Sequence, residues 1–520
     1  MGRSAHPLLT GILVTVTNEG VDEYCDEFGD QIDIAIIGSG FGGLGAAIQL
    51  RRKGFTDFLI FEKADDMGGT WRDNTYPGCA CDVTSNLYSF SFALNPGWSE
   101  TFSGYKEIWE YLTGCADRFG LRPYLRLGHE IQEAAWDEYE KKWLLTTNRG
   151  IFKARVLIAA TGPLSQPSVP DIPGLKSFTG KVFHSAQWDH DYDLSGRDVA
   201  VIGTGASAVQ FVPQIQPKVK RLKLFQRTPG WIVPHVTRKR GRAENWLYQH
   251  IPGLARLNRT LLYWGYESMG VGFMHPRINR VAQRVAERNL RRQVPDPHLR
   301  AQLMPGYTLG CKRVLRSNAF WPVVAEPNVD LITSGIKEIR AGGLVTADGT
   351  EHPVDTIILG TGFHVTDSPV MQRIRGRDQI RLSEAWTPTM RAYLGTTVSG
   401  FPNLFFLLGP NTGLGHTSVV IMIESQLKQV IKTLEHMRRN GMATMEPTAE
   451  AQRRDNAQVD RKMDGTVWMA GGCRSWYLDS TGRNSTLWPG FATTFRLRLR
   501  HFRPADYTFQ KEDSRELAKR

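Results

Sequence analysis

Short apolar runs that end in small-residue turns organise the first half of the chain. Residues 32–37 read IDIAII and lead into GSGFGG, and a stretch with helical periodicity, LGAAIQLRRKGF, follows. The next apolar run, 58–61, ends at Glu62. Unbroken apolar runs of this length are typical of parallel strands that are buried on both faces. The pattern therefore predicts a strand, a glycine turn, a helix and a second strand that ends in an acid.

The same order of elements recurs about 165 positions later. Residues 199–202 predict a strand, a small-residue turn and a helix follow, and the next apolar run, 222–225, ends in Gln226-Arg227-Thr228 without an acid. The small residues of the two turns are Gly38, Gly40 and Gly43 in the first and Gly203, Gly205 and Ala208 in the second. Two units of the mononucleotide-binding type therefore lie in one chain.

Each small-residue turn opens a helix, and this placement suits a bound pyrophosphate. The first small residue allows the tight turn, the second lets a phosphate approach the backbone, and the third lets the helix pack on the strand. Unpaired N–H groups and the helix dipole at the helix N-terminus favour the anion. In the first unit, Glu62 is placed to accept hydrogen bonds from ribose hydroxyls.

The end of the second unit favours NADPH over NADH. An acid there would repel a 2′-phosphate, whereas the guanidinium of Arg227 can bind one and Thr228 adds a hydroxyl donor. Two dinucleotide sites imply electron transfer from NADPH to a bound flavin. A disulfide reductase would need a dithiol beside the flavin, but Cys79 and Cys81 are one residue too close for C-x-x-C. Oxygen is then the obvious electron acceptor.

Two further strand ends with small-residue turns, 156–163 and 356–363, indicate where the chain passes between the two units. We therefore predict an α/β fold of two Rossmann-like, doubly wound dinucleotide-binding domains with a helical insertion. The predicted flavin-binding domain comprises 1–162 and 356–520, with an active-site loop near its end. The NADPH-binding domain comprises 163–355 and carries the insertion at 236–305.

Composition narrows the class of protein. The chain has 520 residues, of which 41% are hydrophobic and 22% charged, which is ordinary globular usage. No stretch approaches the roughly 18 apolar residues of a membrane span, and no secretory signal is recognisable at the start. Six cysteines are too sparse for a disulfide framework, and Cys79 and Cys81 lack a second metal-ligand pair. We expect no metal, reduced thiols and a cytoplasmic location; the sequence carries no signal for an oligomeric state.

The net charge of +12 is concentrated in one segment. Residues 238–300 hold 13 Arg and Lys against 4 Asp and Glu, which is a surplus of +9. The arginines recur at helical intervals beside apolar residues, which favours a solvated helix face over a nucleic-acid surface. The residues of this pattern are Arg277, Arg280, Arg284, Arg288 and Arg291, with Ile278, Val281, Val285 and Leu290.

Residues 178–189 read FTGKVFHSAQWD, just before the second small-residue turn. They match F-x-G-x-x-x-H-x-x-x-W-[P/D], the fingerprint of the type I Baeyer–Villiger monooxygenases, so the chain resembles this family of class B flavoprotein monooxygenases over roughly residues 30–500. Related amine- and sulfide-oxidising enzymes usually lack the tryptophan. The matching residues are Phe178, Gly180, His184, Trp188 and Asp189.

The resemblance implies roles for particular residues. Asp82, which ends a Y-P-G-x-x-x-D segment, would be the active-site carboxylate, and Arg313 would lie over the flavin. Lys312 would join Arg227 and Thr228 on the 2′-phosphate. Trp476 would contact the nicotinamide ribose, and His184 would act as a hinge between domains. FAD would be held by Gly38, Gly40, Gly43, Glu62, Gly68, Gly69, Thr70 and Trp71, beside Asp82.

The activity that the resemblance implies is the NADPH- and O2-dependent conversion of ketones to esters or lactones through a flavin 4a-peroxide, with sulfoxidation as a further reaction. NADP⁺ would stay bound during turnover and help to exclude water. The permanent charge of Arg313 would stabilise the anionic peroxide, and Asp82, paired with Arg313, would hold the arginine in place. Two alternatives remain: an oxygenase of amines or sulfides, and a non-oxygenating NADPH-dependent flavin reductase.

Overall fold

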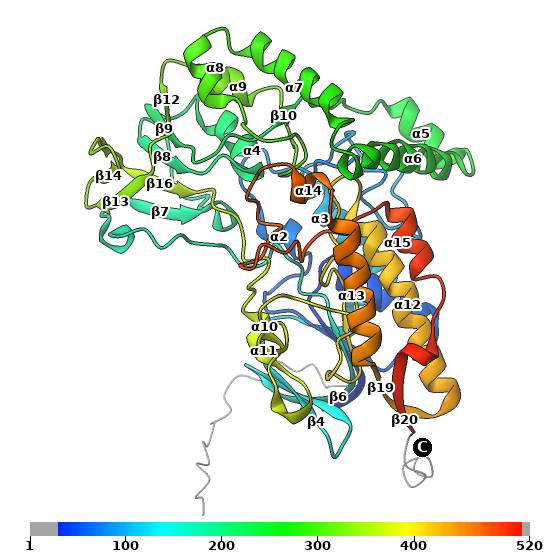
Figure 1. Cartoon of the computed structure of the whole chain (residues 1–520). Coiled ribbons are helices and arrows are strands. Elements are labelled where there is room, and N and C mark those ends of the chain that lie inside the picture. Colours follow the sequence, from blue (N-terminus) through cyan, green and yellow to red (C-terminus); the bar gives the residue numbers. More distant parts are fainter. Residues whose placement is uncertain (1–29, 512–520) are drawn as a thin grey trace, which may run out of the picture.

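The structure is a computed structural model that describes residues 30–511, and two sheets with parallel strands organise it (Figure 1). The strands of the first sheet are β1 (Gln31–Ile37), β2 (Phe58–Phe61), β3 (Leu125–Arg126), β4 (Ile131–Asp137), β5 (Lys142–Thr147), β6 (Gly150–Ala159), β17 (Ile374–Arg375) and β18 (Leu404–Phe406). Their order is β17-β4-β5-β6-β1-β2-β3, with β18 beside β6. Both apolar runs predicted for the first unit form strands, and β1 runs parallel to β2 and β6.

Two helices from opposite ends of the chain pack together in the first domain. α1 (Phe41–Arg52) starts at the glycine turn and lies against α12 (Val419–Asn440). Ile34 and Ile36 of β1 are fully buried in the core that these elements form. The first domain is therefore built from two segments that lie far apart in the sequence.

The second sheet is entirely parallel. Its strands are β7 (Lys181–His184), β8 (Asp198–Ile202), β9 (Arg221–Phe225), β12 (Val329–Ile332) and β16 (Thr356–Leu359), in the order β12-β9-β8-β16-β7. Helix α4 (Ala206–Ile215) follows the second small-residue turn. One predicted boundary is wrong: β16 pairs with β7 and β8, whereas we assigned 356 onward to the first domain. The strand completes the second sheet before the chain returns.

The two connections between the domains run side by side. The Ser168 amide donates to the Gly362 carbonyl at 2.8 Å, and the His364 amide donates to the Gln166 carbonyl at 2.9 Å. Thr361 adds a hydroxyl hydrogen bond to the Ser168 carbonyl. The two chain segments that connect the domains are therefore hydrogen-bonded to each other at the crossing, where the chain passes between the domains.

Four helices occupy the insertion: α5 (Arg242–His250), α6 (Leu254–Met274), α7 (Asn279–Gln293) and α8 (Pro297–Leu303). The Arg259 guanidinium of α6 donates to the carbonyls of Asn86 (2.7 Å) and Leu87 (3.1 Å). The Glu267 carboxylate accepts from the amides of Ala492 (2.9 Å) and Thr493 (3.2 Å) and lies 3.2 Å from His416 Nε2. Buried charges thus attach α6 to the first domain.

The outer side of the insertion exposes apolar as well as charged side chains. The arginines of the pattern are solvent-exposed as predicted, but Ile278, Val281 and Val285 are exposed with them. Among the four apolar residues of the pattern, Leu290 is buried. Periodicity identifies the apolar positions of a helix, but it does not say whether another element covers them.

The remaining elements are shorter or lie outside the two large sheets. The strands are β10 (Ile232–Val233), β11 (Leu315–Arg316), β13 (Ile336–Arg340), β14 (Gly343–Thr346), β15 (Glu351–Pro353), β19 (Met442–Pro447) and β20 (Tyr507–Lys511). The helices are α2 (Thr70–Asp73), α3 (Tyr105–Arg118), α9 (Phe320–Val324), α10 (Val370–Arg373), α11 (Leu382–Ala385), α13 (Ala449–Met463), α14 (Val467–Ala470) and α15 (Ala492–Arg498). Within residues 30–511, no helix has the length and apolar character needed to cross a membrane.

The substitution Glu267→Gln should destabilise the protein by about 1–3 kcal/mol, because one buried acceptor and the charge are lost. Burial acts to raise the pKa of Glu267, but its hydrogen bonds with His416 and Thr493 outweigh burial and lower the pKa. A carboxylate with a lowered pKa contributes stability above its unfolded pKa and loses this contribution as the pH falls through its folded pKa.

Urea unfolding of the wild type and the variant between pH 7 and pH 3 measures this contribution. The difference between the two proteins should shrink as the pH falls below about 4.3. Glu351→Gln removes an exposed carboxylate that pairs with Arg340 and should change the unfolding free energy by less than about 0.5 kcal/mol. A pH-independent difference would contradict the role assigned to the Glu267 charge.

Candidate functional site

A two-point ion pair joins Asp82 to Arg313, as the resemblance led us to expect. Arg313 Nε lies 2.8 Å from Asp82 Oδ2, and Nη2 lies 2.6 Å from Oδ1. The Arg313 side chain keeps 33% of its surface exposed and the Asp82 side chain 27%. The guanidinium is thus fixed in direction, yet one part of it stays accessible to a ligand.

The electrostatics of the pair keep both groups ionised. Burial acts to raise the pKa of Asp82, but the charge and the hydrogen bonds of Arg313 outweigh it, so the pKa lies below its ordinary value. The charge of Asp82 in turn raises the pKa of Arg313 further above its already high value. Position 313 therefore carries a permanent cation at every pH at which the protein is folded.

Tyr477 lies beside Arg313, and the sequence analysis did not identify it as a site residue. Its side chain is 1% exposed, and burial raises its pKa to about 12, although the neighbouring Arg313 charge acts in the opposite direction. Tyr477 directly follows Trp476, which the resemblance identifies as a site residue. A tyrosine in an aromatic loop carries no sequence feature that marks it as part of a site. Trp476 itself is 46% exposed, with its ring centroid 4.3 Å from that of Tyr477. Its contact with nicotinamide ribose stays a prediction.

The cysteines near the pair are poor redox groups. Cys79 and Cys81 are both buried free thiols. Burial raises the pKa of Cys79 to about 12 and that of Cys81 well above its ordinary value. Thiols with raised pKa values are unreactive, because the thiolate is the nucleophile.

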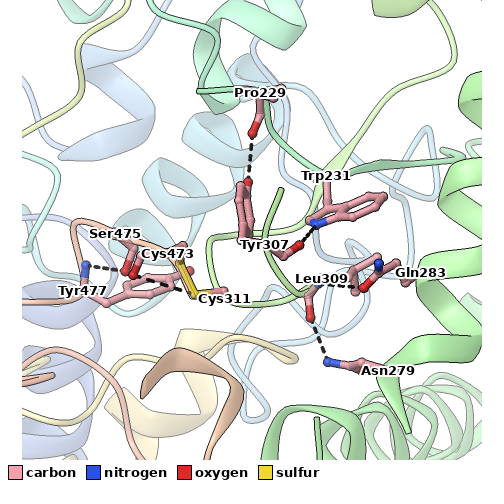
Figure 2. Close-up of a disulfide and its surroundings, with 10 residues drawn as sticks. All are labelled: Pro229, Trp231, Asn279, Gln283, Tyr307, Leu309, Cys311, Cys473, Ser475 and Tyr477. Atoms are coloured by element: carbon pink, nitrogen blue, oxygen red, sulfur yellow. Dashed lines mark hydrogen bonds between the residues drawn. A yellow bond between two sulfur atoms is a disulfide. The ribbon is translucent and has the colours of Figure 1, made fainter. Parts of the chain in front are cut away.

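A disulfide between Cys311 and Cys473 contradicts the expectation that the thiols are all reduced (Figure 2). The two residues are 162 positions apart, so no local spacing indicated their pairing. Cys311 directly precedes Lys312 and Arg313, and Cys473 begins the loop that carries Trp476 and Tyr477. The bond therefore ties the predicted active-site loop to the segment that supplies the cation.

Hydrogen bonds hold the turn before Cys311 in place (Figure 2). The Tyr307 hydroxyl donates to the Pro229 carbonyl at 3.0 Å, and Trp231 Nε1 donates to the Tyr307 carbonyl at 2.7 Å. Asn279 Nδ2 of α7 donates to the Leu309 carbonyl at 2.9 Å. The insertion and the second domain together set the direction in which Lys312 and Arg313 leave the turn.

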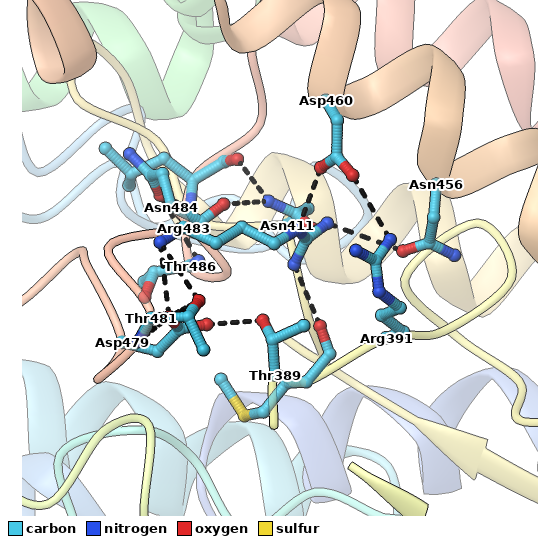
Figure 3. A network of polar contacts seen from close by, with 12 residues as sticks. Thr389, Arg391, Asn411, Asn456, Asp460, Asp479, Thr481, Arg483, Asn484 and Thr486 are labelled. Carbon is cyan, nitrogen blue, oxygen red and sulfur yellow. Dashed lines mark hydrogen bonds and ion pairs between the residues drawn. The ribbon is translucent and has the colours of Figure 1, made fainter. Parts of the chain in front are cut away.

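The far end of the same loop is attached through Arg483 (Figure 3). Its guanidinium donates to Asp460 Oδ1 at 2.8 Å, to the Met390 carbonyl at 2.9 Å and to Asn411 Oδ1 at 3.0 Å. Asp479 Oδ1 accepts from the amides of Thr481 and Arg483, which tightens the turn. The loop 473–490 is thus held at the disulfide and at Arg483.

The first glycine turn has the features that a pyrophosphate site requires. Gly40 is the N-cap of α1, no side chain caps the helix, and its first turn holds no acid, so its free N–H groups can meet an anion. A Cβ at Gly43 would lie 1.8 Å from the Gly38 carbonyl oxygen, so only glycine permits this close packing. Gly69 lies against Gly40, which brings the segment Gly68–Trp71 to the same turn.

Glu62 is buried at the end of β2, where the sequence places it. Its carboxylate accepts from the Ser39 amide (3.1 Å) and hydroxyl (2.7 Å) and lies 3.1 Å from Arg72 Nη1. These contacts orient the carboxylate beside the glycine turn. Its hydrogen bond with a ribose stays a prediction.

The second turn has the same features. Gly205 is the N-cap of α4 without a side-chain cap, and Gly203 has a φ of +105°. The buried Ala208 methyl packs 3.6 Å from the Cβ position of Gly360, so alanine is accepted where the first turn needs Gly43. The two glycine turns lie at corresponding ends of parallel strands in their own sheets.

A cationic group accompanies the second turn. Arg227 and Thr228 are exposed at the end of β9. Burial lowers the pKa of Lys312, and the nearby positive charge of Arg227 lowers it further. Two like charges are costly to bring together without an anion between them. The arrangement therefore fits a 2′-phosphate, and binding of that group stays a prediction.

The fingerprint residues support the edge of the second sheet. Phe178 is buried in the core of this domain, and a Cβ at Gly180 would lie 2.3 Å from the Asp355 carbonyl oxygen. Trp188 packs its ring against Phe183 and Phe211, and Asp189 pairs with Lys181.

His184 ends β7 next to the crossing between the domains. Burial lowers its pKa to about 4, so the imidazole is neutral near pH 7. Its Nδ1 accepts from the Ala186 amide at 3.1 Å. A neutral, internally bonded histidine beside the connections suits a structural role at the hinge, and this role stays a prediction.

The fold and the two helix N-termini define a class of protein, the oxidoreductases with two dinucleotide-binding domains. A family model described as pyridine nucleotide-disulphide oxidoreductase matches residues 35–251. A Baeyer-Villiger monooxygenase of Streptomyces coelicolor is 52% identical over 481 residues, which are 92% of each chain. A Baeyer-Villiger monooxygenase of Pseudomonas aeruginosa is 48% identical over 91% of this chain and 90% of its own.

Solved structures agree in fold. A closed crystal structure of cyclohexanone monooxygenase has a TM-score of 0.83 at 28% identity and covers 93% of this chain and 99% of its own. The crystal structure of OTEMO in complex with FAD and NADP has a TM-score of 0.82 at 27% identity and covers 92% and 99%. The chain belongs to the Baeyer–Villiger monooxygenase family, and the resemblance drawn from the fingerprint is confirmed.

Removal of the Cys311–Cys473 disulfide should lower the free energy of unfolding by about 2–4 kcal/mol, because the bond restricts the unfolded chain across 162 residues. Urea unfolding with and without a thiol reductant measures the effect. The double variant Cys311→Ser/Cys473→Ser should match the reduced wild type and should no longer respond to the reductant.

Cys115→Ser is the matched control, because Cys115 is a buried free thiol. This variant should keep the response to the reductant. If the wild type does not respond, and an alkylating reagent labels residues 311 and 473 in the unfolded, unreduced protein, then the disulfide does not form in solution.

Proposed function

We propose that the protein is an FAD-containing, NADPH-dependent Baeyer–Villiger monooxygenase that uses O2 to convert ketones to esters or lactones, with sulfoxidation as a side reaction. Similarity to the family members above and to the FAD and NADP complex of OTEMO supports the cofactors. The Asp82–Arg313 pair is the observation that carries the proposal, because it supplies a cation that is fixed in direction and partly exposed.

The residues of the first turn fit FAD. The uncapped N-terminus of α1 would hold the pyrophosphate, and Glu62 and the segment Gly68–Trp71 border the same turn. When bound, FAD would accept a hydride from NADPH and activate oxygen for insertion beside a carbonyl. The second turn would hold NADPH, with Arg227, Thr228 and Lys312 around the 2′-phosphate.

The role of the protein's own residues is electrostatic and steric. Ester formation requires an anionic oxidant, and the Arg313 guanidinium would stabilise negative charge on the reacting oxygen. Asp82 fixes the guanidinium and balances its charge before the ligand arrives. The loop 473–490, held at Cys473 and at Arg483, would exclude water from the reaction.

We also propose a cytoplasmic location, because NADPH is regenerated there. Disulfides are rare in that compartment. The buried position of Cys311 limits the access of thiol reductants to its sulfur, which allows the bond to persist.

Arg313→Ala should lower ester formation from a ketone by about 10²-fold or more, because the charge aimed at the reacting oxygen is lost. NADPH oxidation should continue and release hydrogen peroxide. The measurement follows NADPH consumption and the transfer of label from ¹⁸O₂ into a cyclic ketone and into a sulfide, for the wild type, Arg313→Ala and Arg313→Lys. Arg340→Ala, which removes an exposed arginine of β13, is the matched control.

Each function gives a distinct pattern. The proposed function predicts one labelled oxygen atom in the ester or lactone for the wild type. Labelled sulfoxide without any labelled ester would favour the heteroatom oxygenase. NADPH oxidation without label in either product would favour the non-oxygenating reductase and would contradict the proposal.

Arg227→Ala and Lys312→Ala should each raise the KM for NADPH about 10–100-fold and leave the KM for NADH nearly unchanged, because each loses a charge-assisted contact with the 2′-phosphate. Arg221→Ala is the matched control, since Arg221 lies at the start of the same strand and pairs with Asp330. Steady-state kinetics with both coenzymes measures the effect. Equal losses with NADPH and NADH would show that these residues do not contact the phosphate.

A further inference from the structure

The exposed large apolar side chains of the described residues gather in one short segment. Eleven of the nineteen lie in the fifty residues 236–285, on or beside α5, α6 and α7. They are Val236, Trp246, Leu247, Ile251, Leu257, Leu261, Trp264, Met269, Ile278, Val281 and Val285. Single apolar residues are normal on a protein surface. A concentration of this kind is typical of a surface that contacts another protein or a membrane.

Helix α6 is apolar on two faces. Its inner face is anchored by Arg259 and Glu267, as described above. On the outer face Leu257, Leu261 and Trp264, spaced four and three positions apart, are 55%, 64% and 57% exposed. Residues at this spacing form one stripe along a helix. The stripe therefore faces solvent over two turns of the helix.

The neighbouring helices carry exposed apolar residues as well. α5 packs against α6, and the two lie side by side in Figure 1. Trp246 and Leu247 of α5 are exposed. α7 adds Val281 and Val285, which are four positions apart on its exposed side.

The same segment is strongly cationic. Of the four acids in 238–300, Glu267 is buried beside His416, Glu244 pairs with Arg238, Asp296 caps α8, and Glu287 of α7 accepts from the Gln283 amide. Seven exposed arginines on or beside α6 and α7 form no ion pair with any residue of the range 30–511. They are Arg256 of α6, Arg277 before α7, and Arg280, Arg284, Arg288, Arg291 and Arg292 of α7.

We propose that α5, α6 and α7 form a docking surface for an anionic phospholipid bilayer. The leucines and tryptophans would enter the boundary between head groups and acyl chains, and the arginines would contact lipid phosphates. Tryptophan suits this boundary because its ring is apolar and its N–H is polar. The protein would lie on the bilayer without crossing it.

Charge favours this occupant over the alternatives. A second copy docked through the same surface would bring two surpluses of +9 together. A nucleic acid would neutralise the arginines but leave the leucine and valine stripes exposed. An anionic bilayer satisfies both the charge and the apolar stripes.

Flotation of the full-length protein with vesicles tests the proposal. Vesicles of phosphatidylcholine alone are compared with vesicles that contain phosphatidylglycerol. We expect the protein to float with the anionic vesicles, with an affinity that falls as NaCl is raised. Leu257→Ser/Leu261→Ser/Trp264→Ser and Arg280→Gln/Arg284→Gln/Arg288→Gln should each weaken binding at least tenfold.

Val169→Ser/Ile380→Ser removes two exposed apolar side chains outside the insertion and should bind like the wild type. Thermal unfolding of each variant shows that the fold is kept. Three results would overturn the proposal: no preference for anionic vesicles, equal weakening in the control variant, or a concentration-dependent dimer in sedimentation that the apolar variant abolishes. Retarded migration with DNA or RNA but no flotation would also overturn it.

Discussion

The ion pair between Asp82 and Arg313 is the interaction on which the proposed chemistry depends. Its partners lie 231 positions apart, and a third segment brings Tyr477 against the guanidinium. A cation that is fixed before the reaction does not have to reorganise during it, which is the main advantage of a folded site over water. The pair also connects the segment after the first glycine turn to the segment that follows the insertion.

The surrounding structure limits the freedom of this pair. The Cys311–Cys473 bond lies one residue from Lys312, and the turn before it is held by Tyr307, Trp231 and Asn279. The glycine turns of the two sheets direct free N–H groups of α1 and α4 toward their ligands. In the proposed function, the loop, the cation and the two dinucleotide sites therefore act as one assembly that domain movement around the crossing would open or close.

Sequence patterns predicted those elements of the fold that depend on residues close together in the chain. The two strand–turn–helix units were predictable because glycine at positions 38 and 43 meets a backbone requirement that a sequence displays directly. The pairing of Asp82 with Arg313 followed only from resemblance, since no spacing links residues so distant. The disulfide and the contact of Tyr477 are long-range as well, and neither has a recognisable signal.

The insertion shows a different limit. Its helical periodicity was correct, but the periodicity did not say whether the apolar positions of α7 are covered, and Val281 and Val285 are exposed. Coverage depends on which elements pack nearby, and a periodic pattern is the same in a core helix and in a helix that meets a bilayer. The crossing at β16 was misplaced for a related reason, because a buried strand looks alike in either sheet.

A double-mutant cycle on Asp82 and Arg313 tests most directly whether the pair acts as a unit. The rate of ester formation is compared for the wild type, Asp82→Asn, Arg313→Lys and the double variant. If Asp82 acts by fixing the guanidinium, the effects are strongly non-additive, and Asp82→Asn costs little once Arg313 has been replaced. Independent, additive effects of the two substitutions would contradict the account.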